Sequence, residues 1–234
     1  MFVSFYNFGT ILKMNKIKVA VISDTHNRAE KLIMPSADIL IHCGDYSSRG
    51  CEYELEDFKY WIDSVSHLYK HIILVPGNHD RIFQVDEQQS RLTLNNVTVL
   101  IDEYVEILGL RIYGTPYQPF FKNWAFNLKG KALHDKYRKI PDKLDILITH
   151  SPPKGILDSV RQVFDRKTKT YLEHVSYGSE FLYKQVVKKQ PRFHFFGHIH
   201  DSFGVFNSGT TVFANASSCS EKYEITNQVL VFEI

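Results

Sequence analysis

The sequence predicts an α/β fold, in which buried strands alternate with amphipathic helices. Several short runs are almost continuously apolar and rich in β-branched residues, which is typical of strands covered on both faces. Stretches with apolar residues at helical spacing lie between these runs, and glycine, proline and asparagine separate the two kinds of segment. The apolar runs are residues 17–23, 38–43, 71–75, 145–149 and 193–196.

Composition and charge are those of an ordinary globular protein. The chain has 234 residues, 44% hydrophobic and 23% charged, as expected of one α/β domain. The formal net charge is +2 and no long basic run occurs, so neither nucleic acid nor a membrane surface is indicated as a partner. Three cysteines without a framework spacing favour free thiols and a cytoplasmic setting. We expect a monomer or a homodimer.

The first residues differ in character from the rest. The segment MFVSFYNFGTILKMN is apolar and aromatic, but its first positive charge, Lys13, follows the apolar part, whereas a signal peptide has the opposite order. No stretch of the chain approaches the roughly 18 apolar residues of a membrane helix. We therefore expect residues 1–15 to be an N-terminal extension, for which disorder is one interpretation, and residues 16–234 to form a single folded domain.

Short helices and strands are expected between the buried strands of the first half. Residues 54–65 carry Leu55, Phe58, Ile62 and Val65 at helical spacing and predict a helix. The charged and amide-rich residues 81–94 predict another. Residues 97–100, 105–107 and 111–113 are expected to be short strands, the last two joined by a turn at Leu108-Gly109-Leu110.

A long connection, residues 114–128, opens the second half. Its sequence GTPYQPFFKNWAFNL contains two prolines and five aromatic residues. Long loops in compact domains are often functional, so the loop is either a wall of a substrate site, with Trp124 binding substrate, or an aromatic plug that closes the core. Helices are expected over 129–139 and 170–189, although Gly178 argues against the second. A hairpin over 202–206 and 210–214 and a strand over 229–233 complete the pattern.

Polar side chains that can bind metal follow each of the five apolar runs. Taken singly they have ordinary interpretations, such as turn residues for Asp24 and Asp45 or a surface histidine. Ligand sites in α/β sheets lie beyond the carboxyl ends of the strands, so we expect the five strand ends to converge. His42 lies inside a run and is expected to be a hydrogen-bonded core histidine. The candidate ligands are Asp24, His26, Asp45, Asn78, His150, His198 and His200.

This set of side chains indicates two metal ions. Seven oxygen and nitrogen ligands are too many for one ion of ordinary coordination but suit two ions bridged by a carboxylate. Imidazole mixed with carboxylate and amide oxygen suits Mn, Fe, Zn, Ni or Co better than Ca or Mg. A structural zinc site is disfavoured because the cysteines are not grouped. Two-metal sites of this kind occur in many phosphoester hydrolases, whose substrates include small-molecule phosphoesters.

The order of these residues resembles the calcineurin-like metallophosphoesterase superfamily. Its pattern is DxH, GD, GNH(D/E), a lone histidine and GHxH. All five blocks occur here in order, as Asp24-Thr25-His26, Gly44-Asp45, Gly77-Asn78-His79-Asp80, His150 and Gly197-His198-Ile199-His200. More narrowly, GTPYQPFFKNWAFNL, DILITHSPPKGILD and Asn215–Ser217 are similar to the small brain-expressed metallophosphoesterase-domain proteins and their bacterial relatives, which are described as cyclic-nucleotide-type phosphodiesterases.

The resemblance implies a fold, a metal pair and residue roles. The fold would be a four-layer α/β/β/α sandwich of two mixed sheets flanked by helices. Two divalent transition-metal ions would bind, Mn²⁺ first, with Fe, Zn, Ni or Co as alternatives. The nucleophile would be a metal-bridging hydroxide, and His79 would protonate the leaving alkoxide or orient the phosphoryl group. One metal would take Asp24, His26 and His200, the other Asn78, His150 and His198, with Asp45 bridging.

One motif departs from a related pattern. In GDYSSRG, Arg49 matches the phosphate-binding arginine of the phosphoprotein phosphatases, but Ser48 replaces an aspartate of their GDxxDRG. The missing carboxylate leaves the partner of His79 open and disfavours a protein phosphatase. For Arg49, a phosphate clamp and a solvated surface arginine both remain open.

The predicted function is hydrolysis of small organic phosphodiesters, such as cyclic nucleotides. A phosphomonoesterase of the same fold is one alternative. A non-catalytic metal-binding interaction module is another, and the retained ligand set argues against it. A DNA nuclease would require a basic surface and an added nucleic-acid-binding segment, neither of which the sequence contains.

Overall fold

The computed structural model describes residues 16–165, 167 and 169–234, so the extension predicted for residues 1–15 lies outside the described residues. Two large β-sheets form the centre of the fold. Among the described residues, no helix combines the length and the apolar character needed to cross a membrane.

The first sheet has the strand order β15-β1-β2-β3-β4. Every residue of β2 is buried, as its continuous apolar sequence predicts. The parallel strands are β1 (Lys18–Ile22), β2 (Ile39–His42), β3 (His71–Leu74) and β4 (Thr98–Val99), and β15 (Leu230–Glu233) runs antiparallel to β1.

The second sheet has the order β13-β14-β12-β9-β6-β5. The predicted turn between β5 and β6 is confirmed, because Leu108 and Gly109 have positive φ values of 52° and 79°, as a two-residue hairpin turn requires. The parallel strands are β6 (Leu110–Thr115), β9 (Ile146–Thr149), β12 (Phe193–Phe196) and β14 (Val212–Asn215), and the antiparallel edges are β5 (Glu103–Ile107) and β13 (Gly204–Asn207).

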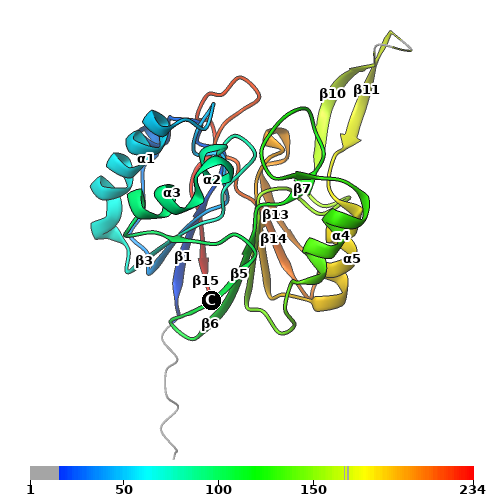
Figure 1. Ribbon diagram of the computed structural model, residues 1–234. Coiled ribbons are helices and arrows are strands. Elements are labelled where there is room, and N and C mark those ends of the chain that lie inside the picture. Colours follow the sequence, from blue (N-terminus) through cyan, green and yellow to red (C-terminus); the bar gives the residue numbers. More distant parts are fainter. Residues whose placement is uncertain (1–15, 166, 168) are drawn as a thin grey trace, which may run out of the picture.

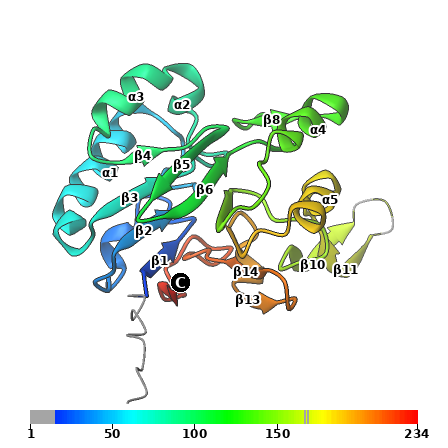
Figure 2. The same cartoon turned by 90° about the horizontal axis from the view of Figure 1, so that it is seen from below.

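Helices cover the outer face of each sheet, which confirms the expected α/β/β/α order (Figure 1). Apolar side chains from the facing sheets, such as Val21, Ile41, Ile148 and Phe195, fill the layer between them. Figure 2 shows the same division from below, with the two groups of helices on opposite sides. Helices α1 (Glu52–Val65), α2 (Ile82–Val85) and α3 (Glu87–Thr93) lie beside the first sheet, and α4 (Gly130–Arg138) and α5 (Glu180–Lys189) beside the second.

The single helix predicted over residues 81–94 is wrong, because the structure has two helices there. Asp86 leaves the helical conformation, with φ −144° and ψ 79°, and separates α2 from α3. Its carboxylate accepts a hydrogen bond from the Gln89 amide at 3.0 Å. Aspartate is a preferred N-cap, so Asp86 begins a new helix instead of continuing the old one.

The helix predicted over residues 170–189 is wrong in its first part. Residues Thr170–Ser176 form strand β11, which pairs with β10 (Ser159–Asp165) in a hairpin that the sequence analysis did not predict. Helix α5 begins only after Ser179, whose hydroxyl accepts a hydrogen bond from the Leu182 amide. The hairpin projects beyond the body of the molecule (Figure 1).

The long connection 114–128 contains a small pair of strands of its own. These are β7 (Gln118–Pro119) and β8 (Asn127–Leu128), which pair in parallel. The Gln118 amide nitrogen also donates to the Asn127 side-chain oxygen at 3.1 Å. The segment between them, which includes Trp124, is thereby closed into a loop.

Candidate metal centre

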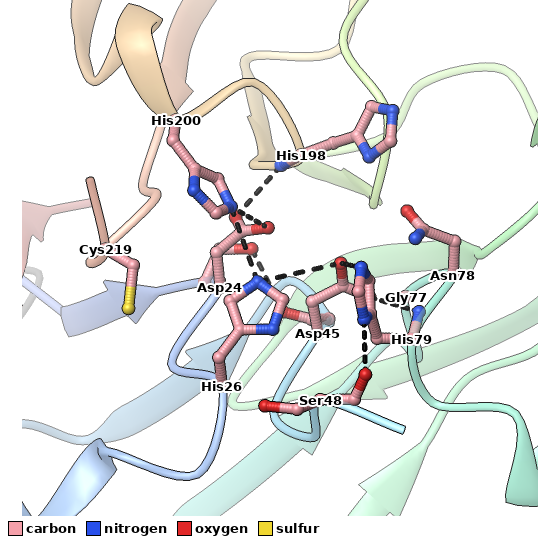
Figure 3. Close-up of polar contacts among 12 residues, drawn as sticks. Asp24, His26, Asp45, Ser48, Gly77, Asn78, His79, His198, His200 and Cys219 are labelled. Atoms are coloured by element: carbon pink, nitrogen blue, oxygen red, sulfur yellow. Dashed lines mark hydrogen bonds and ion pairs between the residues drawn. The ribbon is translucent and has the colours of Figure 1, made fainter. Parts of the chain in front are cut away.

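The ends of five strands meet at one edge of the sandwich. β1, β2 and β3 of the first sheet and β9 and β12 of the second each end beside predicted ligands. In Figure 3, Asp24, His26 and His200 point toward one another, and His79 lies beside Asp45. Three overlapping groups have ligand atoms within 4.8 Å of one another: Asp24, His26 and His200; His26, Asp45 and His79; and Asp45, His150 and His198.

The backbone turns sharply where it presents these side chains. Asp24, His26, Asp45 and His198 have positive φ values of 52°, 43°, 56° and 70°. The left-handed region is uncommon for residues with a Cβ, but aspartate and histidine enter it more readily than most. Such conformations cost about 1–3 kcal/mol each and cluster at functional sites. The DxH, GD and GHxH sequences therefore provide both the turn and the ligand.

Two glycines let the backbone approach the carboxylates closely. A Cβ at Gly77 would lie 2.2 Å from Oδ1 of Asp45, and a Cβ at Gly197 would lie 2.1 Å from Oδ2 of Asp24. These distances are far below van der Waals contact, so only glycine fits at either position.

Asp24, His26 and His200 form the first ligand group. Nε2 of His200 lies 3.4 Å from Oδ1 of Asp24 and 3.4 Å from Nε2 of His26. Oδ2 of the fully buried Asp24 accepts hydrogen bonds from the His198 amide at 2.9 Å and from the Ser217 hydroxyl at 2.8 Å. Oδ1 has no hydrogen-bond partner among the described residues. A buried carboxylate oxygen left unpaired beside imidazole nitrogens fits a cation ligand.

Asp45, Asn78, His150 and His198 form the second group. Nε2 of His150 lies 3.3 Å from Oδ2 of Asp45 and 3.0 Å from Oδ1 of Asn78. The rings of His150 and His198 have centroids 5.0 Å apart. Oδ2 of Asp45 also lies 4.0 Å from Nε2 of His26, so this carboxylate contacts both groups.

Backbone carbonyl groups orient three of the histidines. A carbonyl only accepts hydrogen bonds, so each Nδ1 carries a hydrogen and each Nε2 is the atom turned to the centre, where it can bind a metal once it carries no proton. Metal-ligating histidines are usually held in this way by a group behind the ring. The Nδ1 atoms of His26, His150 and His200 lie 2.9, 2.9 and 3.0 Å from the carbonyl oxygens of Ser47, Cys43 and Ser220.

Burial and neighbouring charges shift the pKa values of the histidines in opposite directions. Burial lowers the pKa of His26 to about 4 and that of His198 to about 3. At His150 and His200, burial is outweighed by the neighbouring aspartates, which raise the pKa to about 9. In the metal-free protein, protons on these two rings balance the buried carboxylates, and bound cations would take over that role.

His79 faces the centre from beside the ligand groups. Its Nε2 lies 4.0 Å from Oδ2 of Asp45, and its Nδ1 donates to the Ser48 carbonyl oxygen at 2.6 Å. The partner of His79 that the GDYSSRG sequence left open is therefore a backbone carbonyl. The Trp124 ring lies against the imidazole, with centroids 3.9 Å apart and planes inclined by 32°. These contacts hold Nε2 toward the centre.

A cavity of about 230 Å³ opens over the centre. Its lining includes Asp45, His79 and Trp124, which the sequence analysis selected. Tyr223 packs edge-on against His26, with ring centroids 4.7 Å apart. The lining also includes Phe121 and Lys122, which lie in the loop 114–128 but were not predicted as site residues, and Glu221 and Tyr223, which no motif marked.

Residues of the long loop 114–128 lie in both the core and the cavity, so a substrate contact of Trp124 stays a prediction. Phe126 is 3% exposed and belongs to the core beside the first sheet, so it acts as a plug. Trp124 is partly exposed and lines the cavity, as a substrate wall would.

Two residues named from the sequence lie outside the cavity. His42 is a hydrogen-bonded core histidine, as predicted, because its Nδ1 accepts from the Gly44 amide at 3.1 Å and its Nε2 lies 3.0 Å from Thr25 Oγ1. Arg49 is exposed, its amide donates to Glu54 at 2.9 Å, and it is not among the described residues that line the cavity. A phosphate contact for Arg49 stays a prediction.

Asp80 connects the ends of β2 and β3. The carboxylate is fully buried, and its Oδ2 accepts from the amides of Asp45 and Gly77 at 2.8 and 2.7 Å. Its Oδ1 accepts from the Ser47 amide at 3.1 Å and hydroxyl at 2.8 Å. Burial and the charge of Asp45 raise the pKa of Asp80 to about 7, although the four donors favour its ionised form. The sequence analysis gave Asp80 no role.

Known proteins resemble this chain in sequence or in fold. The chain is 37% identical over 240 residues to human metallophosphoesterase domain-containing protein 1, covering 91% of this chain and 69% of that protein. A UPF0046 protein of Caenorhabditis elegans is 33% identical over 232 residues, covering 93% and 75%. A solved crystal structure with 16% identity has a TM-score of 0.59 over 93% of this chain and 99% of the other, which shows the shared fold. Residues 17–202 match calcineurin-like phosphoesterases, and the chain belongs to that family of metal-dependent phosphoric ester hydrolases.

Proposed function

We propose that the protein is a dinuclear-metal-dependent phosphodiesterase that hydrolyses small organic phosphodiesters, such as cyclic nucleotides. The observation that carries this proposal is the position of Asp45, whose Oδ2 lies 3.3 Å from His150 and 4.0 Å from His26. A carboxylate between two ligand groups suits a pair of ions about 3.5–4 Å apart. Bound ions would supply Lewis-acid activation of the phosphoryl group and of water, and Mn²⁺ is our first choice for this ligand mixture.

The residues of the chain would then hold the metals and supply a proton. Asp24, His26 and His200 would bind one ion, Asn78, His150 and His198 the other, and Asp45 both. Nε2 of His79, which lies 4.0 Å from Asp45, would carry the proton that the leaving alkoxide takes up. Trp124 and the Ser48 carbonyl would keep that nitrogen directed at the substrate.

The charge of the cavity supports a diester over a monoester. Lys122 and Glu221 both line the cavity, and their charges oppose each other. A phosphodiester carries one negative charge, whereas a phosphomonoester carries about 1.5–2 at neutral pH. Because the opposite charges of Lys122 and Glu221 leave this wall without net charge, it adds no attraction for the extra negative charge of a monoester, which favours the diester. The free cysteines Cys43, Cys51 and Cys219 support the cytoplasmic setting that we propose for the reaction.

A paired assay with elemental analysis tests the proposal. Wild type and His79→Ala are purified, their bound metal is quantified, and both are assayed with Mn²⁺ on cyclic nucleotides, bis(p-nitrophenyl) phosphate and p-nitrophenyl phosphate. We expect about two ions per chain in both proteins and, in the variant, a loss of diester turnover of about 10²–10⁴-fold.

The other outcomes distinguish the alternatives. Turnover of the monoester alone would make the protein a phosphomonoesterase. Tight metal binding without turnover of any ester would favour the interaction module. Absence of bound metal from both proteins would refute the metal centre.

A further inference from the structure

A second cavity of about 310 Å³ lies beside the metal centre. It shares Phe121, His198 and Glu221 with the cavity over the centre, so the two adjoin at these residues. We propose that the second cavity is a substrate subsite for an uncharged, planar organic group of the phosphoester, with the Ser151 hydroxyl as its hydrogen-bonding residue. The inference rests on the proposed function, because it concerns the part of the substrate that does not react.

Aromatic side chains give the second cavity an apolar wall. Phe120, Phe121 and Tyr177 line it and remain 52%, 45% and 41% exposed, respectively. Large apolar side chains that gather around a concave surface usually mark a binding site, and a volume near 300 Å³ is within the range of small-molecule pockets. Aromatic rings bind flat groups by stacking and accept any ring that has a π face.

Ser151 provides a neutral polar group beside the aromatic wall. It follows the ligand His150 directly, is 1% exposed and belongs to the lining of the second cavity. Its Oγ has no hydrogen-bond partner among the described residues. A buried hydroxyl without a partner is costly, so a ligand atom that donates to it or accepts from it would gain a hydrogen bond.

The charge of the lining determines which groups the pocket accepts. Glu221 is the one carboxylate among the described residues of the lining, which include no lysine or arginine. A second phosphate or a carboxylate would be repelled by this negative charge. The nearby cations Lys122 and Lys129 lie instead against the Phe121 and Phe120 rings, with Nζ 4.9 and 3.7 Å from the ring centroids. A neutral ring with polar edge atoms, such as a nucleobase, meets no such penalty.

The wall formed by the β10–β11 hairpin is held in place at its base. Asp158, which is 3% exposed, accepts hydrogen bonds from the Gly155 and Gly178 amides at 2.9 Å each, on either side of the hairpin. The Ser202 hydroxyl donates to the Ser159 carbonyl at 2.7 Å. These bonds fix Val160 and Tyr177 next to the short helix that begins at His200, so the subsite is built relative to a metal ligand.

Two esters with the same leaving group test the subsite. Thymidine 5′-(p-nitrophenyl phosphate) and methyl p-nitrophenyl phosphate differ only in the group that would enter the second cavity. We expect wild type to favour the thymidine ester in kcat/KM by about 5- to 100-fold, the range of one stacked base. Phe121→Ala should remove most of this preference, and Ser151→Ala should reduce it by about 2- to 10-fold, as for one neutral hydrogen bond.

Matched variants control for general damage. Phe206→Ala removes an exposed phenylalanine of β13 that lines neither cavity, and Ser218→Ala removes a hydroxyl that is also buried and unpartnered. Both should keep the wild-type preference. If wild type hydrolyses the two esters equally, or if these controls lose the preference as Phe121→Ala and Ser151→Ala do, the subsite is wrong.

A binding measurement separates this inference from the proposed function. Saturation-transfer NMR with thymidine and metal-free protein needs neither metal nor turnover. We expect transfer to the base protons in wild type and its loss in Phe121→Ala. If the enzyme hydrolyses neither ester, the proposed function fails, and absence of transfer from wild type then also overturns the subsite.

Discussion

Replacement of Asp80 by asparagine should destabilise the protein although it removes no metal ligand. Each carboxylate oxygen of Asp80 accepts two hydrogen bonds: Oδ2 from the Asp45 and Gly77 amides, and Oδ1 from the Ser47 amide and hydroxyl. Asparagine of the same shape offers one oxygen and one NH₂ group. One carboxylate oxygen, which accepts two hydrogen bonds, is therefore replaced by an NH₂ group that faces the same two donors.

The change in unfolding free energy depends on which of the four hydrogen bonds of Asp80 remain in Asp80→Asn. The asparagine oxygen would take the Oδ2 position, because both partners there are backbone amides that cannot turn away. The Ser47 hydroxyl can still donate to the His79 carbonyl, which lies 3.1 Å away, but the Ser47 amide loses its acceptor. A buried donor left without a partner costs about 1–3 kcal/mol, and two bonds that lose an ionised acceptor weaken by about 1 kcal/mol each. Asparagine also removes the cost of ionising a buried carboxylate beside Asp45, which is the cost that raises the pKa of Asp80 to about 7. This offsets most of the loss, so we expect a net destabilisation of about 1 kcal/mol at pH 7.

Thermal and urea unfolding of the metal-free proteins measure this loss. For a chain of this size, about 1 kcal/mol corresponds to a fall in Tm of about 2–4 °C. Asp86→Asn is the matched control, since Asp86 caps α3 and asparagine caps a helix as well as aspartate does. If the unfolding free energies of Asp80→Asn and wild type agree within about 0.5 kcal/mol, the connection that Asp80 makes between the ends of β2 and β3 does not stabilise the protein.

Further predictions concern the metal ligands and the aromatic wall. Because neighbouring aspartates outweigh burial and raise the pKa of His150 and His200 to about 9, metal-free protein at pH 7 should release protons when it binds Mn²⁺, and its apparent affinity should rise with pH until about pH 9 and then level off. Calorimetry in buffers of different ionisation enthalpy measures the release, and a binding heat that is the same in all buffers contradicts it. In Gly197→Ala, the new Cβ would lie 2.1 Å from the Asp24 carboxylate and must displace it, so Mn²⁺ affinity should fall about 10- to 100-fold while circular dichroism stays that of a folded protein. Trp124→Ala should reduce turnover of cyclic nucleotides far more than that of p-nitrophenyl esters, because Trp124 would direct His79 at a leaving alkoxide, which needs a proton, whereas p-nitrophenolate does not. An equal loss on both substrates with a lowered Tm would instead mean that Trp124 serves the core.

Much of the metal centre could be predicted from the sequence because its ligands are placed by local rules. A doubly covered strand has a recognisable apolar run, and a parallel strand presents its next residues at one edge of the sheet. Asp24, Asp45, Asn78, His150 and His198 each follow such a run, and the structure brings them together. The glycine of GHxH has a local reason as well, because a Cβ at Gly197 would collide with the Asp24 carboxylate.

Two helix predictions were wrong in segments whose sequence contains a helix-capping residue. Thr170–Ser176 was assigned to a helix, although Ser179 followed by Glu180 is an ordinary helix start and places the boundary after the strand. Asp86 likewise marks the start of α3 inside a stretch that was assigned to one helix. In both segments, a capping residue decided the structure against the overall composition.

The family, the candidate ligand set and the alternation of strands and helices could be predicted from the sequence, because each motif and each apolar run consists of residues close together in the chain. The surroundings of the site could not be predicted in this way. The Ser48 carbonyl behind His79, the four donors to Asp80, and the place of Lys122, Glu221 and Tyr223 around the cavity all depend on contacts between distant segments. Such contacts produce no periodic pattern and no motif in the sequence, since any residue of suitable size can make them once the sheets have packed together.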